Sequence, residues 1–386
     1  MMFKKLKQKK LEEGIQIQSL SYKEHEVTRP LWEKTFDEDS KEFVDFYYKN
    51  KVENNSIWVA KDGEIVLSMA QLNPYQIHLG PSIVPTHYIV GVATQEEYRR
   101  QGLMRKILES ALHQMHENKE PFTYLMPAKE EYYTGFDFVT VYYQNSGTML
   151  EISADTQLTF KSAVEDDFRS LAIFSEAVLS EKYCVFVNRE ESYYQTIKKQ
   201  FEAEHGEIVC VFDLNVLVGY FFYGEYDEIN VIEPVCLDKY KDEFAHVIAK
   251  KFKESEKEIN VTALDFLNED DFKNIVTKPV TMTRIVSLAM FVRYLKASEP
   301  IELMIEMVDE FIEANNGVFS LCIGLENADI VASSKEPEMI LSIGEFTAIC
   351  FFDDIPKAIA EKLSEYTIDK IKMVKKFNPM FLNEMV

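Results

Sequence analysis

Residues 88–105 of the chain read YIVGVATQEEYRRQGLMR. The first part belongs to an apolar, β-branched run, His87 to Ala93, that predicts a buried strand. The positions after Gly102 predict a helix, because apolar residues recur there at helical spacing: Leu103, Met104, Ile107, Leu108, Ala111, Leu112 and Met115. A strand that turns directly into a helix presents free backbone N–H groups, and these attract a pyrophosphate.

The turn is basic, although the chain as a whole is acidic. Arg99, Arg100 and Arg105 surround Gly102, whereas the chain has 42 Lys and Arg against 65 Asp and Glu and a formal net charge of -23. A glycine allows the backbone to approach phosphate groups closely, because it has no Cβ. We therefore predict an anion site at this turn. The alternative is an ordinary solvated loop with a glycine at the helix start.

The composition limits the class of protein. At 386 residues and 46% hydrophobic content, the chain has enough material for two or three packed domains. Its negative charge repels nucleic acids and favours cationic partners. The five cysteines are scattered, which suggests neither a disulfide framework nor a metal site. The sequence contains no apolar run of about 18 residues, so we expect neither export nor a membrane span. We expect a cytoplasmic protein.

The surrounding elements predict a mixed sheet covered by helices. Helical residues from Lys23 to Asn50 precede a hairpin (56–72), the strand and helix described above, and a strand from Phe122 to Met126. The same order follows after Ile152, which predicts an internal duplication with a helix at 190–204, strands at 207–213, 216–223 and 229–237, and a helix at 238–252. A third α+β unit is expected to begin with a helix from Ile301 to Ala314.

The turn resembles the acetyl-CoA motif of the GNAT superfamily of N-acetyltransferases. In that motif an arginine or glutamine is followed by two residues, a glycine, one residue and a small residue; Arg99, Gly102 and Met104 stand at these positions. Met104 is larger than the family's glycine or alanine. Together with LMPAKEEYYTGFDF at 125–138, the sequence looks like the enhanced intracellular survival (Eis) family of acetyltransferases.

The resemblance implies an α/β (α+β) fold in three parts. Residues 1–150 would form the N-terminal catalytic GNAT domain and residues 151–290 a second GNAT-like domain without a cofactor motif. Residues 291–386 would form a domain similar to sterol carrier proteins, whose end returns to the active site. Relatives form homo-oligomers, commonly hexamers.

The resemblance also implies which residues bind acetyl-CoA, the co-substrate. A splayed and bulged strand would pair with the pantetheine arm and offer main-chain donors to the thioester carbonyl. The turn and helix start would hold the pyrophosphate. The residues expected to bind the co-substrate are Val90, Val92, Ala93, Thr94, Arg99, Arg100, Gln101, Gly102, Leu103, Met104 and Arg105.

Two catalytic groups follow from the same resemblance. Tyr133 matches the tyrosine that protonates the departing thiolate, although its neighbour Tyr132 is easily confused with it, and either is an ordinary core residue without the family match. The α-carboxylate of Val386 would act as the base, through water or by attracting the ammonium group. Simple packing of an apolar end is the alternative for Val386.

The acceptor side is expected to attract a primary amine. Trp32, Phe36 and Asp37 offer aromatic and acidic groups suited to a cation, and Glu384 could assist. Plain core packing and capping are equally plausible for the first three. His113 and His116 lack companions at ligand spacing, so we expect no metal site.

The predicted activity is direct acetyl transfer to an aminoglycoside, polyamine or lysine amine. The alternative is a non-catalytic acyl-CoA or apolar-ligand binding module with a regulatory role. No nucleic acid or membrane partner is expected.

Overall fold

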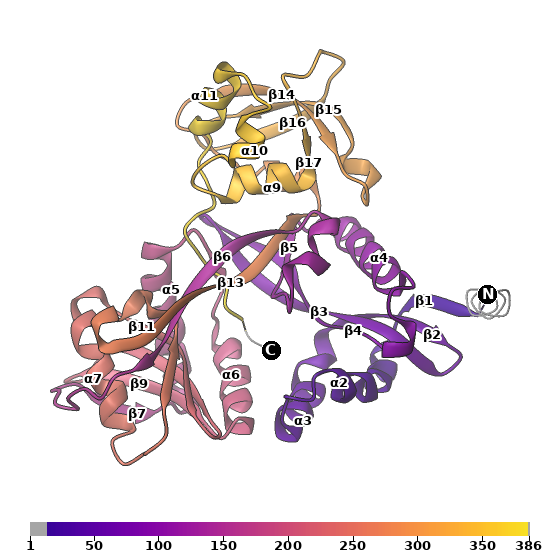
Figure 1. The fold of residues 1–386 in the computed structure, drawn as a ribbon. Coiled ribbons are helices and arrows are strands. Elements are labelled where there is room, and N and C mark those ends of the chain that lie inside the picture. The colour runs from indigo at the N-terminus through magenta and orange to yellow at the C-terminus, as the bar shows by residue number, and fades with distance from the viewer. Residues whose placement is uncertain (1–13, 385–386) are drawn as a thin grey trace.

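The computed structural model describes residues 14–384, which form two β-sheets with helices packed on them (Figure 1). The larger sheet has 14 strands and the smaller has four. The strands of the larger sheet are β1 (Ile15–Ser19), β2 (Ser56–Asp62), β3 (Ile65–Leu79), β4 (Ser82–Thr94), β5 (Phe122–Leu125), β6 (Val139–Met149), β7 (Thr159–Ser162), β8 (Val185–Val187), β9 (Glu207–Asp213), β10 (Val216–Glu225), β11 (Ile229–Cys236), β12 (Ile259–Thr262), β13 (Phe272–Ile285) and β18 (Met380–Phe381). Those of the smaller sheet are β14 (Ile301–Val308), β15 (Gly317–Ile323), β16 (Ala328–Ala332) and β17 (Met339–Ser342).

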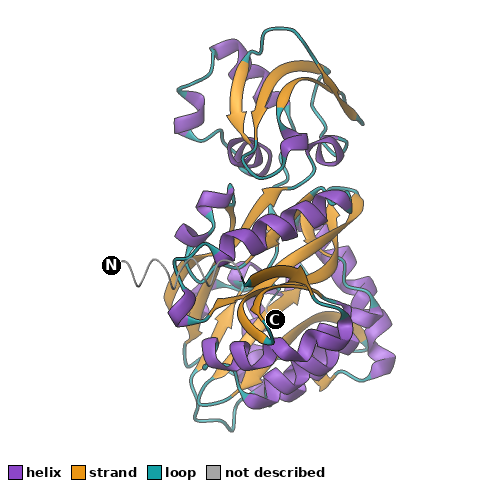
Figure 2. Cartoon of the chain, turned by 90° about the vertical axis from the view of Figure 1, so that its right-hand side faces the viewer, coloured by secondary structure: helices purple, strands orange, loops and turns teal. Residues whose placement is uncertain are grey.

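The α-helices lie on both faces of the larger sheet and beside the smaller one (Figures 1 and 2). They are α2 (Arg29–Thr35), α3 (Lys41–Asn50), α4 (Leu103–Glu117), α5 (Phe168–Lys182), α6 (Glu191–Ala203), α7 (Lys241–Lys251), α8 (Leu288–Val292), α9 (Ile343–Phe351), α10 (Lys357–Ala360) and α11 (Glu365–Met373). No helix within residues 14–384 is long and apolar enough to cross a membrane.

The middle part of the chain repeats the architecture of the first part. The order α2, α3, β2, β3, β4, α4, β5, β6 reappears as α5, α6, β9, β10, β11, α7, β12, β13. This order confirms the predicted duplication. We refer to residues 14–150 as the first section, 151–290 as the middle section and 291–384 as the last section.

The first two sections exchange their final strands. β13 lies between β5 and β6 and pairs antiparallel with both, and β6 pairs antiparallel with β12 of the middle section. Each half therefore completes the sheet of the other, and residue 150 directly follows a strand in the middle of one continuous sheet (Figure 1).

One predicted element is wrong. The segment Ile301–Ala314 is not a helix, because its first eight residues form β14, which pairs with β15 and β17. Leu303, Ile305 and Met307 alternate with Glu302 and Glu306 along this strand, and the alternate apolar positions are buried. This alternation of apolar and polar residues, with a period of two, is typical of a strand and is visible in the sequence.

The last section is anchored to the large sheet by a buried ion pair. The guanidinium of Arg284, on β13, donates to Asp309 Oδ1 at 2.5 Å, and both side chains are fully buried. Asp309 also accepts hydrogen bonds from the backbone N–H groups of Phe311 and Ile312 and from the amide of Asn315.

The final described residues leave the last section and return to the large sheet. β18 pairs in parallel with β8, and Thr281 Oγ1 donates to the carbonyl oxygen of Leu382 at 2.5 Å. We refer to residues 379–384 as the closing segment. Figure 1 shows this segment, in yellow, descending into the body formed by the first two sections.

Candidate functional site

The strands β4 and β5 diverge beside the predicted anion site. They pair in parallel at only two positions, Tyr88 with Tyr124 and Ile89 with Leu125, where β5 ends. Among the described residues, the β5-facing edge of β4 from Val90 to Thr94 therefore has no strand partner. Such an edge offers free backbone groups to an extended ligand.

A β-bulge interrupts β4 at the start of this free edge. Met69 pairs with Ala93 and Gln71 with Val90, so β4 has an extra residue at Gly91–Val92. Gly91 has a φ of +59°, which disfavours any residue with a side chain. The bulge anticipated from the sequence is thus present, and it turns main-chain groups of β4 away from the ladder.

The turn between β4 and α4 is open and uncapped. Arg100 and Gly102 both have positive φ angles, 61° and 79°, and no side chain caps the helix at Gly102. A Cβ built on Gly102 would meet no atom within 4 Å, so the helix start faces open space. Exposed N–H groups and the positive end of the helix dipole suit a phosphate here.

The basic residues of the turn have different partners. Arg99 Nε donates to the carbonyl oxygen of Thr94 at 3.2 Å, whereas Arg100 is exposed without a described contact. Arg105 is held by Glu109 at 2.8 Å and by Glu310 of the last section at 2.6 Å. Arg99 and Arg100 are therefore the arginines with charge left for an anion, and Arg105 links α4 to the last section.

Tyr133 lies in the apolar core on the α4 side of the sheet. It belongs to the same buried cluster as Leu103, and Val92 and Met104 pack against that cluster. Burial raises the pKa of Tyr133 to about 12, so the phenol keeps its proton at neutral pH. Its neighbour Tyr132 is 53% exposed. Tyr133, and not Tyr132, thus shares a buried cluster with Leu103 of the helix start.

Trp32 connects the bulge to an acidic residue. A Cβ on Gly91 would lie 2.5 Å from the Trp32 ring, and the indole Nε1 donates to Asp39 Oδ2 at 2.8 Å. Phe36 packs on the Trp32 ring at a centroid distance of 5.0 Å, while Asp37 is exposed. Asp37 was the acidic residue predicted from the sequence for the acceptor side. The carboxylate that contacts Trp32 instead belongs to Asp39.

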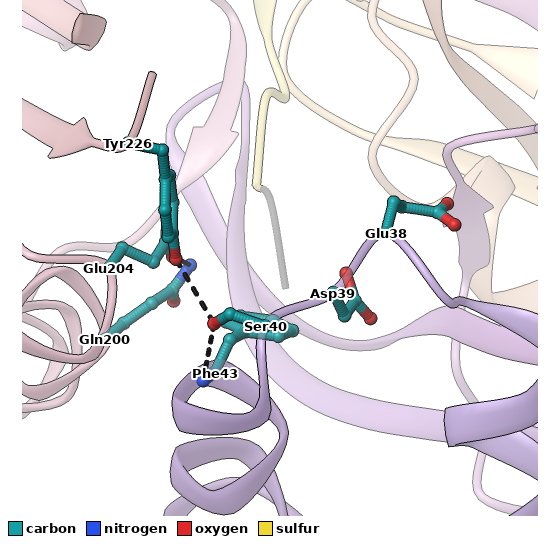
Figure 3. A pocket seen from close by; sticks show the side chains of 7 residues that line it. All are labelled: Glu38, Asp39, Ser40, Phe43, Gln200, Glu204 and Tyr226. Atoms are coloured by element: carbon teal, nitrogen blue, oxygen red, sulfur yellow. Dashed lines mark hydrogen bonds between the residues drawn. The ribbon is translucent and has the colours of Figure 1, made fainter. Parts of the chain in front are cut away.

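An acidic pocket opens between the first two sections (Figure 3). The pocket is a cavity of about 300 Å³. One wall comes from the turn before α3 and from the first residues of that helix: Glu38, Asp39, Ser40 and Phe43. The other wall comes from the middle section: Gln200, Glu204 and Tyr226. Tyr226 donates to Ser40 Oγ at 3.2 Å and closes one side. No Lys or Arg lines this pocket among the described residues.

The two inner carboxyl groups of the acidic pocket are hard to ionise. Burial and the nearby Asp39 raise the pKa of Glu204 to about 7, against a hydrogen bond from Gln200 that lowers it. Burial likewise raises the pKa of Asp39, against the hydrogen bond from Trp32. A cation bound in the pocket would stabilise the ionised forms of both carboxyl groups and so lower their pKa values.

Glu384 lies in a buried network in the middle section. Tyr193 donates to its carboxylate at 3.1 Å and Arg189 at 3.3 Å, while Arg189 also holds both oxygens of Glu233 at 2.8 Å. Glu384 is 3% exposed, so its carboxylate is occupied by these partners and fixes the closing segment. Val386 lies outside the described residues.

The middle section has a degenerate copy of the bulge. Tyr220 pairs with Val235 and Phe222 with Ile232, so Glu233 and Pro234 occupy the positions of Gly91 and Val92, and Glu233 has a φ of +55°. Proline has no N–H to donate. Glu233 instead binds Arg189, so this bulge holds the closing segment indirectly and offers no donor to a thioester.

No cluster of three or more potential metal ligands is found within residues 14–384. His113 is exposed and His116 is half-buried on α4.

The chain is similar to one known protein family and to several solved structures. Residues 3–141 match the family described as the acetyltransferase (GNAT) domain. No curated protein matches the chain. The fold is similar to that of a probable N-acyltransferase from Enterococcus faecalis V583, with a TM-score of 0.78 at 15% identity over 94% of this chain and 97% of that one.

Two further solved structures share the fold over nearly their whole length. A GCN5-related N-acetyltransferase from Anabaena variabilis has a TM-score of 0.76 at 15% identity, covering 95% of this chain and 99% of that one. Eis1 from Mycobacterium abscessus has a TM-score of 0.69 at 12% identity, covering 96% and 99%. The splayed strands, the bulge and the uncapped helix thus lie in the part of this mixed α/β chain, residues 3–141, that matches the GNAT acetyltransferase domain.

Proposed function

We propose that the chain is an acetyl-CoA-dependent N-acetyltransferase that acetylates a primary amine in a ternary complex. The observation that carries the proposal is the divergence of β4 from β5 at a bulge, on the strand that leads into the uncapped start of α4. GNAT acetyltransferases use acetyl-CoA, and the open space at Gly102 suits its pyrophosphate.

In this proposal the chain supplies donors and a proton. The free edge of β4, including Val90, Ala93 and Thr94, pairs with the pantetheine arm, and the N–H of Val92 stabilises charge on the thioester oxygen. Arg99, Arg100, Gln101 and the N–H groups of residues 102–105 hold the diphosphate. Tyr133 donates a proton to the departing thiolate, which its raised pKa permits at neutral pH.

The acceptor is a cationic amine that enters through the acidic pocket. Asp39 and Glu204 attract the ammonium group, and the contact of Trp32 with both Asp39 and Gly91 supports a path from the pocket to the bulge. This chemistry fits a polyamine, an aminoglycoside or a lysine side chain.

The remaining features of the proposal rest on the resemblance to the Eis family. They are the α-carboxylate of Val386 as the base, a sterol-carrier-like last section, a hexamer and a cytoplasmic location. The buried anchor at Glu384, two positions before Val386, supports the first of these.

Thiol release from acetyl-CoA, measured with a panel of amines, tests the proposal. Release that depends on the amine is expected, and it should be lost when residues are added after Val386 but not when they are added at the N-terminus. Release no faster than hydrolysis with every amine favours the alternative, an acyl-CoA binding module.

A further inference from the structure

A second cavity lies at the other end of α3 from the acidic pocket. It measures about 350 Å³ and is lined by the end of α3, by β3 and by the start of α6. Lys51 follows α3 directly, whereas Ser40, which lines the acidic pocket, precedes it. At 1.5 Å per residue the ten-residue helix separates the two cavities by about 15 Å. We refer to this cavity as the Lys51 pocket.

The cation in the Lys51 pocket has no counter-ion. Lys51 Nζ donates to the Tyr75 hydroxyl at 2.8 Å and lies over the Tyr75 ring, but no carboxylate among residues 14–384 forms an ion pair with it. Glu384 is the acid that acts on it through space, and that carboxylate is already held by Arg189 and Tyr193. Burial lowers the pKa of Lys51 to about 8, because the charged ammonium group loses hydration in the pocket.

An amide group in the same pocket also lacks a partner. Asn73 is 2% exposed, and its Oδ1 accepts from the Tyr47 hydroxyl at 3.0 Å, but its Nδ2 is buried without a hydrogen bond. A buried N–H without an acceptor costs about 1–3 kcal/mol. Among the described residues, Asn73 Nδ2 therefore lacks an acceptor, and Lys51 Nζ has N–H groups left beyond the one that it donates to Tyr75.

The start of α6 adds to this positive character. Glu190 is the N-cap residue of this 13-residue helix, no side chain caps it, and Ser192 and Tyr193 of its first turn line the pocket. The N-terminal end of a helix dipole favours an anion. Three independent features, an ammonium group, an amide and a helix start, thus point toward an acceptor-rich, negatively charged ligand.

The lining favours a carboxylate over a phosphate. No arginine within the described residues 14–384 lines the pocket, and the exposed Glu190 at its rim disfavours a dianion. The other walls carry amides that both donate and accept: Asn50, Asn54, Asn55, Gln76 and Asn188. Hydroxyl or amide groups on a ligand match such walls.

We propose that the Lys51 pocket binds a small, polar organic acid whose carboxylate is held by Lys51 and Asn73. This site does not depend on acetyl transfer, and it is separate from the acidic pocket.

Calorimetric titration with matched pairs of probes tests this site without any acetyl-CoA. Each pair consists of an acid and a counterpart without a carboxylate: gluconate and sorbitol, lactate and lactamide, propionate and propionamide. We expect at least one acid to bind at least tenfold more tightly than its counterpart and more tightly than inorganic phosphate. Lys51→Met should abolish this preference, and Lys49→Met, which changes an exposed lysine on the same helix, should preserve it.

Two further results keep the test decisive. Lys51→Met should melt at a temperature no lower than the parent protein, because it removes an uncompensated buried charge, so a loss of binding will not reflect unfolding. Asn73→Asp adds a negative charge with little change in shape and should also abolish binding. The proposal is overturned if no pair shows a preference for the acid, if the preference survives in Lys51→Met, or if phosphate binds as well as the acids.

Discussion

The ring of Trp32 packs so closely on Gly91 that a single methyl group on this glycine would lie 2.5 Å from the ring. The same indole donates to Asp39 at 2.8 Å. One tryptophan therefore fixes both the bulge of β4 and a carboxylate of the acidic pocket. The Trp32 side chain therefore contacts both the proposed thioester site and the proposed amine site.

Gly91→Ala should disrupt this link. An alanine costs about 1–2 kcal/mol at a positive φ and a further 1–3 kcal/mol for overpacking. We expect a lower melting temperature and at least a tenfold lower kcat/KM for amine acetylation. Gly63→Ala is the matched control, because Gly63 has a φ of +58° but open space around its Cβ. It should lose about 1 kcal/mol of stability and keep full activity. Equal activity in both variants would show that the contact with Trp32 is not needed.

Tyr133→Phe should lower turnover more than tenfold with little change in the affinity for acetyl-CoA. The variant removes the proton donor but keeps the ring that packs in the α4-side core. Stopped-flow thiol release and calorimetry separate the two effects. Tyr132→Phe changes the exposed neighbour and should leave both quantities unchanged. If Tyr133→Phe turns over at the parent rate, another group must protonate the thiolate.

Binding of a diamine should strengthen with pH through the titration of Glu204. The pKa of Glu204 is about 7 in the free protein, and putrescine stays doubly charged at pH 6 and 8. If the cation binds the ionised form, affinity rises about tenfold between these pH values. The raised pKa also means that ionising Glu204 costs stability as the pH rises through about 7, so putrescine should raise the melting temperature more at pH 8.

Calorimetry with putrescine in the absence of acetyl-CoA measures this dependence. Glu204→Gln should weaken binding and flatten the pH profile, whereas Glu202→Gln, which alters an exposed acid in the last turn of α6, just before Glu204, should preserve it. A steep profile in Glu204→Gln would assign the pH dependence to another group.

Arg284→Met should destabilise the protein by about 3–5 kcal/mol, because it leaves the carboxylate of Asp309 buried without its counter-charge. Chemical denaturation measures the change. Restoring stability with the double variant Arg284→Met, Asp309→Leu is not expected, since Asp309 also accepts two backbone N–H groups and an asparagine amide. Parent-like stability of Arg284→Met would mean that the ion pair does not anchor the last section.

The local pattern of the sequence predicted the elements around Gly102 better than it predicted the long-range assembly. The strand, turn and helix around Gly102 rest on contacts within a few residues, so periodicity and turn chemistry reveal them. Neither periodicity nor turn chemistry in the sequence predicts the exchange of β6 and β13. β13 carries Pro279 and mostly exposed residues in its first half, and its place depends on pairing with strands more than 120 residues away.

The pockets were hidden for the same reason. Asp39 and Glu204 lie 165 positions apart in the sequence, and Lys51 and Asn73 become neighbours only when α3 packs beside β3. A run of acids at 37–39 offered no means of choosing Asp39 over Asp37. The choice depends on the direction in which α2 ends and on the hydrogen bond from Trp32.

The most direct measurement is a calorimetric titration of acetyl-CoA into the protein and into the Gly102→Ala variant. The added Cβ would project into the open space before α4, where the diphosphate is proposed to lie. We predict one bound acetyl-CoA per chain and at least a tenfold loss of affinity in Gly102→Ala, with parent-like affinity in Gly63→Ala. No heat of binding, or equal affinity in all three proteins, would contradict the assignment of this turn as the co-substrate site.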